Sequence, residues 1–242
     1  MTPIVMSWSG GKDGCMALAT LLAATNEYRV VTLLTTLMEG RERVQIQNIR
    51  RQLIERQAES LGLPLRLVHV PQGANNIEYE TRVAEALDDL KTAGVETVAF
   101  GDLFLEDIRA YREQFLRRCG MTALFPLWKR DTTILVHDFI DRGYQAIITA
   151  VDAVALDRSF AGRTLDRDFL DALPASVDPS GERGEFHTFA YGGPLFREEI
   201  RFRVGEVTTA DGHFFCDLIP KSTRAATTPT AGEGTNGPAH RG

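Results

Sequence analysis

The stretch "PIVMSWSGGKDGCMALATLL", residues 3–22, connects an apolar segment to a helix-like one through adjacent glycines, a lysine and an aspartate. Residues 3–8 predict a buried strand, and residues 13–24 have the apolar spacing of a helix. Adjacent glycines at the end of a strand let backbone N–H groups approach a ligand closely. The positive end of the following helix dipole lies at the same point. We therefore interpret residues 9–14 as a loop that binds phosphate groups.

The charged residues of this loop suggest how it would bind an anion. Lys12 adds a positive charge, whereas Asp13 would repel phosphates unless it holds a magnesium ion or caps the helix. Gly14 in the first helical turn costs about 1 kcal/mol relative to alanine, which predicts a close approach by a ligand or another backbone segment. The glycine spacing excludes the P-loop and the G-x-G-x-x-G loop. A turn whose glycines serve packing alone stays an alternative.

The order of apolar segments predicts the fold class. Strand-like and helix-like segments alternate through the first half, which indicates a Rossmann-like parallel α/β sheet with right-handed crossovers. The expected strands cover residues 3–8, 30–37, 65–70 and 97–100, and the expected helices cover residues 13–24, 46–61, 78–92 and 106–119.

The second half is less regular and predicts a smaller α+β domain. After an extended connector over residues 124–131, we expect helices over 131–142 and 165–173 and strands over 145–151, 187–191, 200–207 and 213–218. Asp131 would cap the first of these helices. We place the domains at residues 1–122 and 123–220. The small, polar residues 221–242 predict a disordered tail.

Composition narrows the classes of function. The chain has 242 residues and a net charge of −6, which argues against nucleic acid as its main partner. It has no apolar run long enough to span a membrane and no secretory signal pattern. Its three cysteines are Cys15, Cys119 and Cys216, an odd and scattered set that fits a reducing cytoplasm. The sequence leaves open whether the chain forms a homodimer.

Two further stretches carry polar residues beside expected strand ends. Gly101 and Asp102 follow the fourth strand, and they would face the first loop if the first and fourth strands are neighbours. Gly101 would admit a nucleotide, and Asp102 would bond its sugar or a metal, although a simple turn is an alternative. In "DPSGERGEFHTF", residues 178–189, strand spacing places Glu185 and His187 on one face for base catalysis or metal binding. A hairpin with a polar rim is the alternative.

Five motifs in order resemble one known family. "SGGKD" resembles the PP-loop of the ATP pyrophosphatases, whose usual form is SGG-x-DS. "FGDLFLEDIRAYRE", "FPLWKRDT", "LDRSFAGRTLD" and "GERGEFHTF" resemble further motifs of the diphthine–ammonia ligase family of adenine-nucleotide α-hydrolase-like proteins. The resemblance covers about residues 5–196, most of the chain. It implies a five-stranded parallel nucleotide-binding domain followed by a smaller α+β domain.

The resemblance also implies a reaction and its site. ATP would be cleaved to AMP and pyrophosphate with Mg²⁺, an acceptor carboxylate on a protein or small molecule would be adenylated, and ammonia or another amine would displace AMP. The implied pyrophosphate cradle is the first loop, namely Ser9, Gly10, Gly11, Lys12, Asp13 and Gly14, with Asp13 near the metal. Gly101 and Asp102 would line the nucleotide crevice. The implied acceptor side is Trp128, Asp131, Glu182, Glu185 and His187.

One departure from the family pattern keeps other functions open. Gly14 stands where the family has serine, so a hydroxyl contact worth about 1–2 kcal/mol is lost. This change favours a nucleotide-binding protein without turnover as one alternative. A PP-loop enzyme that modifies transfer RNA is another, although the chain has no pair of closely spaced cysteines.

Overall fold

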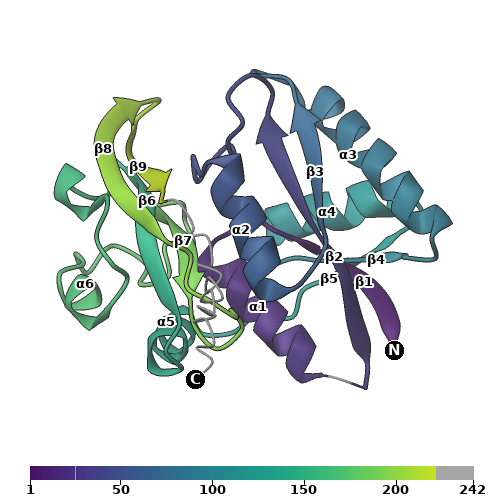
Figure 1. Ribbon diagram of the computed structural model, residues 1–242, viewed down its shortest axis with the longest axis horizontal. Helices are drawn as coiled ribbons and strands as arrows, with labels where there is room; N and C mark the ends of the chain where they lie inside the picture. Colours follow the sequence, from purple (N-terminus) through teal and green to yellow (C-terminus); the bar gives the residue numbers. More distant parts are fainter. Residues whose placement is uncertain (25, 222–242) are drawn as a thin grey trace, which may run out of the picture.

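The computed structural model describes residues 1–24 and 26–221, which build two sheets (Figure 1). The first sheet has five parallel strands in the order β3-β2-β1-β4-β5. Their bounds are β1 Thr2–Ser7, β2 Tyr28–Met38, β3 Leu65–Val70, β4 Thr97–Ala99 and β5 Thr122–Leu124. The expected parallel α/β sheet is confirmed. Sequence periodicity misses β5, because three residues are too few to show an alternating pattern.

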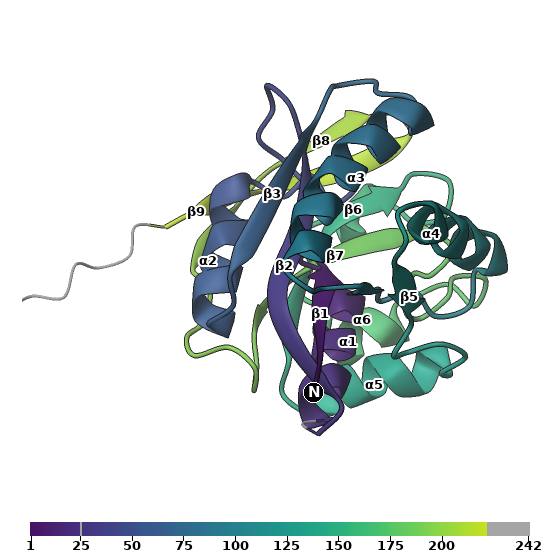
Figure 2. The same ribbon diagram turned by 90° about the vertical axis from the view of Figure 1, so that its right-hand side faces the viewer.

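Four helices cover the two faces of this sheet. They are α1 Lys12–Ala23, α2 Arg51–Leu61, α3 Asn76–Thr92 and α4 Glu106–Arg118. Helices α1 and α2 pack on the face turned toward the second sheet, where Leu18 and Leu53 are fully buried. Helices α3 and α4 cover the opposite face, seen from the front in Figure 2, where Leu87 and Leu116 are buried.

The segment before α2 departs from the expected helix over residues 46–61. The helix begins only at Arg51, and residues 44–49 form a loop whose ends are paired through an Arg43–Arg50 bridge. Asn48 adopts a left-handed φ of 53°, which a continuous helix does not allow. Both arginines also bind Asp217 of the second sheet, at 2.9 Å and 2.6 Å. Ile46 in this loop is 55% exposed, whereas the apolar spacing of a helix over residues 46–61 would bury it.

The second sheet is antiparallel, with the strand order β7-β6-β9-β8. Its elements are α5 Thr132–Asp141, β6 Gln145–Asp152, a 3-10 turn Arg158–Phe160, α6 Arg167–Asp171, β7 Phe186–Gly192, β8 Phe202–Ala210 and β9 His213–Pro220. The expected smaller α+β unit is therefore present. The tail expected over residues 221–242 lies outside the described residues except for Lys221.

The two sheets share one apolar core and a polar contact at its edge. Gln57 on α2 is fully buried, and its amide donates to the carbonyl oxygens of Gly10 and Ala190 at 2.9 Å and 2.5 Å. Its oxygen accepts a bond from the indole of Trp8 at 2.9 Å. Because this one side chain satisfies groups from β7 and from the loop after β1, it fixes the two units against each other.

Strand order places the site. It reverses between β1 and β4, which are paired neighbours, so the segments that follow these strands lie on either side of a crevice. The condition for Gly101 and Asp102 to face the first loop is thus met. Within residues 1–24 and 26–221, no helix is both long and apolar enough to cross a membrane.

Candidate functional site

A cavity of about 650 Å³ opens at the carboxyl ends of β1 and β4. Both units contribute to its wall, since β7 and the loop before it lie against the start of α1. The lining includes most of the predicted site, namely Ser9, Gly11, Lys12, Asp13, Gly14, Gly101, Asp102, Glu182 and His187. Its size suits a nucleotide-sized ligand. Gly10, Trp128, Asp131 and Glu185 are predicted site residues that lie outside the lining.

Gly10 packs against α2 and β7 and does not line the cavity. Its φ is +83°, and a Cβ there would lie 2.7 Å from Ile54 Cδ1 and 2.8 Å from Gln57 Oε1. Any larger residue would therefore be strained and would also clash. The Gly10 carbonyl oxygen accepts a bond from the Ala190 amide at 2.8 Å, in addition to that from Gln57.

The N-cap residue of α1 provides no side-chain hydrogen bond to the first turn of the helix. Gly11 is the N-cap and has no side chain, and Asp13, a predicted alternative cap, lies within the first turn instead. The Lys12 amide donates to Thr188 Oγ1 of β7 at 3.0 Å, while the Gly11 amide donates to Ser9 Oγ at 3.4 Å. A helix N-terminus with its positive dipole end thus faces the cavity.

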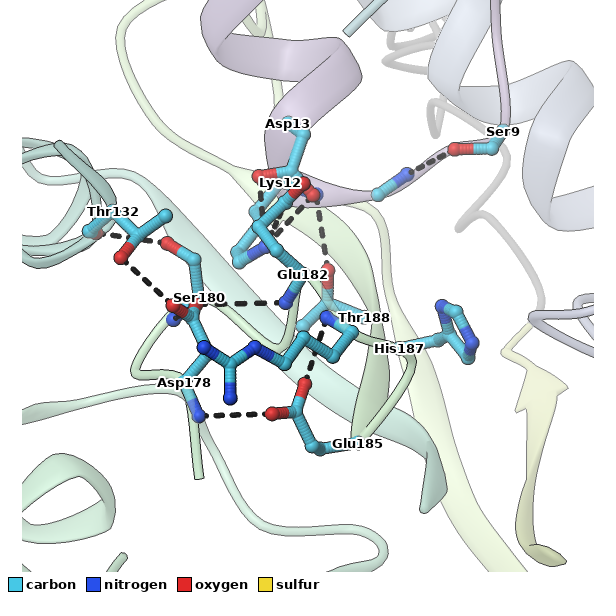
Figure 3. Close-up of polar contacts among 12 residues, drawn as sticks. Ser9, Lys12, Asp13, Thr132, Asp178, Ser180, Glu182, Glu185, His187 and Thr188 are labelled. Atoms are coloured by element: carbon cyan, nitrogen blue, oxygen red, sulfur yellow. Dashed lines mark hydrogen bonds and ion pairs between the residues drawn. The ribbon is translucent and has the colours of Figure 1, made fainter. Parts of the chain in front are cut away.

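A buried cluster of charges lies beside this helix start (Figure 3). The Lys12 ammonium group, 4% exposed, binds both carboxylate oxygens of Asp13 at 2.7 Å and lies 3.9 Å from Glu182 Oε1. Burial raises the pKa of Asp13. Burial and the charge of Asp13 raise the pKa of Glu182 to about 8. The two carboxyl groups of Asp13 and Glu182 have only the Lys12 ammonium group between them, so a further cation bound nearby would be attracted to the cluster.

Glu185 and His187 do not form the expected acid–base pair. Glu185 precedes β7, and its two oxygens accept bonds from the backbone amides of Asp178 and Arg183 at 3.0 Å and 2.9 Å. It therefore stabilises the loop that carries Glu182. The His187 ring lies on β7 and points away from Lys12, Asp13 and Glu182 in Figure 3. The expectation of a shared face is wrong because the strand begins only at Phe186.

His187 is held in its neutral form. Burial, with added repulsion from Lys12 and His213, lowers the pKa of His187 to about 4. The ring lines the cavity, so at neutral pH it offers an uncharged nitrogen to a ligand.

This pKa makes the stability of the protein depend on pH. Between pH 6.5 and 4 the unfolded chain binds a proton at position 187 that the folded chain excludes, so stability falls as pH falls. We expect the change from pH 7 to pH 5 to remove about 2 kcal/mol of unfolding free energy through this residue. Urea unfolding of the wild type and His187→Gln at both pH values measures it. Equal losses in the two proteins would contradict the assignment.

Gly101 and Asp102, the two predicted site residues that follow β4, make different kinds of contact. A Cβ on Gly101 would lie 2.9 Å from Asp13 C and Gly14 N, so this glycine is where two backbone segments meet. Asp102 Oδ2 lies 2.7 Å from Arg112 Nε, although the N–H is not aligned with it, and Oδ1 accepts a bond from Nη2 at 3.2 Å. The Arg112 guanidinium also stacks on Phe100, 4.3 Å from the ring centroid. The two residues are ten positions apart, and the apolar pattern of α4 gives no sign that they pair.

Gly14 has space around it. A Cβ there would lie 3.5 Å from the Trp8 ring, which is ordinary van der Waals contact. The backbone crowding considered for Gly14 is found at Gly101 instead, and close approach of a ligand to Gly14 stays a prediction. No backbone crowding explains why position 14 is glycine.

Trp128 and Asp131 have local partners. The Arg109 guanidinium lies 4.6 Å from the Trp128 ring centroid, and the Phe125 ring lies 5.8 Å away. Asp131 caps α5 by accepting a bond from the Ile134 amide at 2.9 Å, as the sequence predicts.

Several residues that contribute to the site were not predicted from the sequence. Gln45 and Gln47 reach the cavity from the loop before α2, and Arg183 reaches it from the loop before β7. Gln57 and Thr188 act through contacts with residues far away in the chain. A buried glutamine in the inward stripe of α2 was the one cue that the sequence offered.

Comparison with known proteins gives two matching family models. The diphthamide synthase N-terminal domain matches residues 1–123, and the diphthamide synthase C-terminal domain matches residues 131–219. Diphthine–ammonia ligase of Schizosaccharomyces pombe is 28% identical over 88% of this chain and 38% of its own length. The Bos taurus and Homo sapiens enzymes of that name are 28% and 27% identical, over 87% of this chain and 86% of theirs. The chain thus spans well under half of the S. pombe relative.

A solved structure gives a much weaker match. The U34-tRNA thiolase NcsA from Methanococcus maripaludis is 16% identical over 56% of each chain, with a TM-score of 0.34.

Proposed function

Because this chain belongs to the diphthamide synthase family, we propose that it is an ATP-dependent ligase that forms an amide from an acceptor carboxylate. One observation carries the proposal: a buried lysine and a helix N-terminus lie in the same cavity as the carboxyl group of Glu182 from the second unit. The first group of features suits phosphates, and the second suits proton transfer. We assign nucleotide binding to residues 1–122 and acceptor binding to residues 123–220.

The first step of the proposed reaction activates the acceptor. A carboxylate oxygen of the acceptor attacks the α-phosphorus of ATP, and the bond to the bridging oxygen of the β-phosphate breaks. Pyrophosphate leaves with the negative charge. Backbone amides in the first turn of α1 other than those of Gly11 and Lys12, which bind Ser9 and Thr188, act with the Lys12 ammonium group to bind the phosphates and stabilise the charge that develops on them.

The second step forms the amide. The nitrogen lone pair of ammonia attacks the acyl carbon, the bond from that carbon to the AMP oxygen breaks, and the nitrogen loses a proton. We assign the role of proton acceptor to Glu182, whose pKa near 8 suits a base that works close to neutral pH. His187 contributes a neutral ring nitrogen to the same cavity.

Mg²⁺ fits the chemistry of the site. This ion usually binds through one or two carboxylates together with substrate phosphates, and Asp13 supplies such an oxygen beside the phosphate loop. The described residues contain no group of three or more metal-binding side chains, so phosphates would complete the coordination. When bound, the ion would neutralise phosphate charge. A cytoplasmic location and a homodimer stay predictions.

Product analysis tests the proposal. The protein is incubated with ATP, Mg²⁺, ammonium and a protein that carries diphthine, the acceptor that the names of its relatives suggest. We expect AMP and pyrophosphate in equal amounts, and an acceptor whose mass changes from a carboxylate to an amide. ADP as the product would contradict the ligase proposal. Tight ATP binding with no AMP, with this acceptor or with small carboxylic acids, would favour a nucleotide-binding protein without turnover, the alternative suggested by Gly14.

A further inference from the structure

We infer that Thr188, on β7 of the second unit, belongs to the phosphate cradle and donates a hydrogen bond from its hydroxyl to a phosphate oxygen. The inference rests on the proposed ATP site and extends it to a residue more than 170 positions from the loop. It makes nucleotide binding depend on both units of the protein.

The Thr188 hydroxyl has a free donor inside the cavity. The residue is 4% exposed and lines the cavity wall. Its oxygen accepts the Lys12 N–H at 3.0 Å, a contact drawn in Figure 3. A hydroxyl can also donate one bond, yet within residues 1–24 and 26–221 no acceptor receives it. A buried donor without a partner, placed at a helix N-terminus, is suited to an anionic oxygen.

The position of Thr188 is set by backbone contacts. The amide of Ala190, two residues along β7, donates to the Gly10 carbonyl oxygen at 2.8 Å, and Gln57 binds the carbonyl oxygens of both residues. A Cβ on Gly11 would lie 3.2 Å from the Thr188 carbonyl oxygen, so a glycine lets β7 approach this closely. The hydroxyl therefore keeps a fixed place relative to the loop.

The loop of residues 9–14 has few side-chain groups that could donate a hydrogen bond to a phosphate. Gly10, Gly11 and Gly14 offer backbone groups alone, and Ser9 supplies the one hydroxyl within residues 9–14. Thr188 brings a further hydroxyl to the same helix start from outside the loop. Its bond to Lys12 N also orients the residue whose ammonium group provides the positive charge.

Pyrophosphate and ATP binding to Thr188 variants test the inference by calorimetry. Thr188→Val removes the hydroxyl and nearly keeps the shape, whereas Thr188→Ser keeps the hydroxyl. We expect the valine variant to bind both ligands about tenfold more weakly, because a hydrogen bond to a charged group is lost. The serine variant should bind within about threefold of the wild type. Thr149→Val is the matched control, since Thr149 is also buried and its hydroxyl contacts the His187 carbonyl oxygen at 3.3 Å.

The outcomes separate this inference from the proposed function. If Thr188→Val binds the ligands as tightly as the wild type, or if Thr188→Ser is weakened as much as Thr188→Val, the role of the hydroxyl is wrong while the proposed ATP site stands. A wild type that binds neither ligand would overturn the ATP site itself. If Thr188→Val does not fold, Thr188→Ala against Thr188→Ser decides by the same criteria, because these two differ only in the hydroxyl.

Discussion

Asp13→Asn should lower the rate of AMP formation by about a hundredfold or more while leaving the fold intact. The substitution removes the carboxylate that pairs with the Lys12 ammonium group at 2.7 Å and that we propose as a ligand of Mg²⁺. Without it, the phosphates lose a fixed positive charge and the lysine loses its orientation. The loss should appear in the catalytic rate constant as well as in ATP affinity.

The pKa of Asp13 explains why stability should survive this change. Burial raises the pKa of its carboxyl group, so the folded protein already disfavours the charged form. A neutral amide of similar shape removes that unfavourable charge, although Lys12 then keeps only the more distant Glu182 as a partner. We expect the unfolding free energy to change by about 1 kcal/mol or less.

A matched control identifies the cause. Asp138→Asn on α5 changes the same chemical group, in a residue that pairs with Arg142 at 3.0 Å on the surface. Its rate of AMP formation should stay within about twofold of the wild type, as expected for an exposed ion pair. If Asp13→Asn keeps more than about a tenth of the wild-type rate, the proposed role of Asp13 is wrong.

Gly101→Ala should destabilise the protein by about 2 kcal/mol and weaken ATP binding. The new methyl group would lie 2.9 Å from Asp13 C and Gly14 N, which are backbone atoms that cannot rotate away. Relief of the clash requires the start of α1 to move away from β4. That movement displaces the amides and the lysine that we assign to phosphate binding.

Gly14→Ala is the matched control, because the two glycines lie next to each other. A methyl group at position 14 would contact the Trp8 ring at 3.5 Å without a clash. Alanine is the better helix former by about 1 kcal/mol, so this variant should be more stable than the wild type. Urea unfolding and calorimetric titration with ATP measure both variants. Equal effects of the two substitutions would show that backbone crowding at Gly101 is not the cause.

Sequence patterns revealed the parts of the site that are local. The order strand, glycine pair, helix is written in one continuous stretch, and its geometry follows from glycine conformation and the helix dipole. The alternation of apolar segments likewise predicted the parallel sheet, and Asp131 was predicted as a helix cap. Strand β5 was missed because three residues are too few to show a period. Helix α2 was predicted to begin too early because Ile46 and Ile49 continue its apolar spacing ahead of Arg51.

The sequence by itself determined the strand–glycine–helix order around residues 9–14, the α/β class and the family, since each depends on residues that are neighbours in the chain. Only the tertiary structure decided which distant groups complete the site. In the folded protein the Thr188 hydroxyl accepts a bond from the Lys12 amide, and the Glu185 carboxylate binds backbone amides. Backbone crowding occurs at Gly101 and not at Gly14. The physical reason is that hydrogen bonds and steric contacts depend on distance in space. Spacing along the chain does not encode the position at which β7 meets α1.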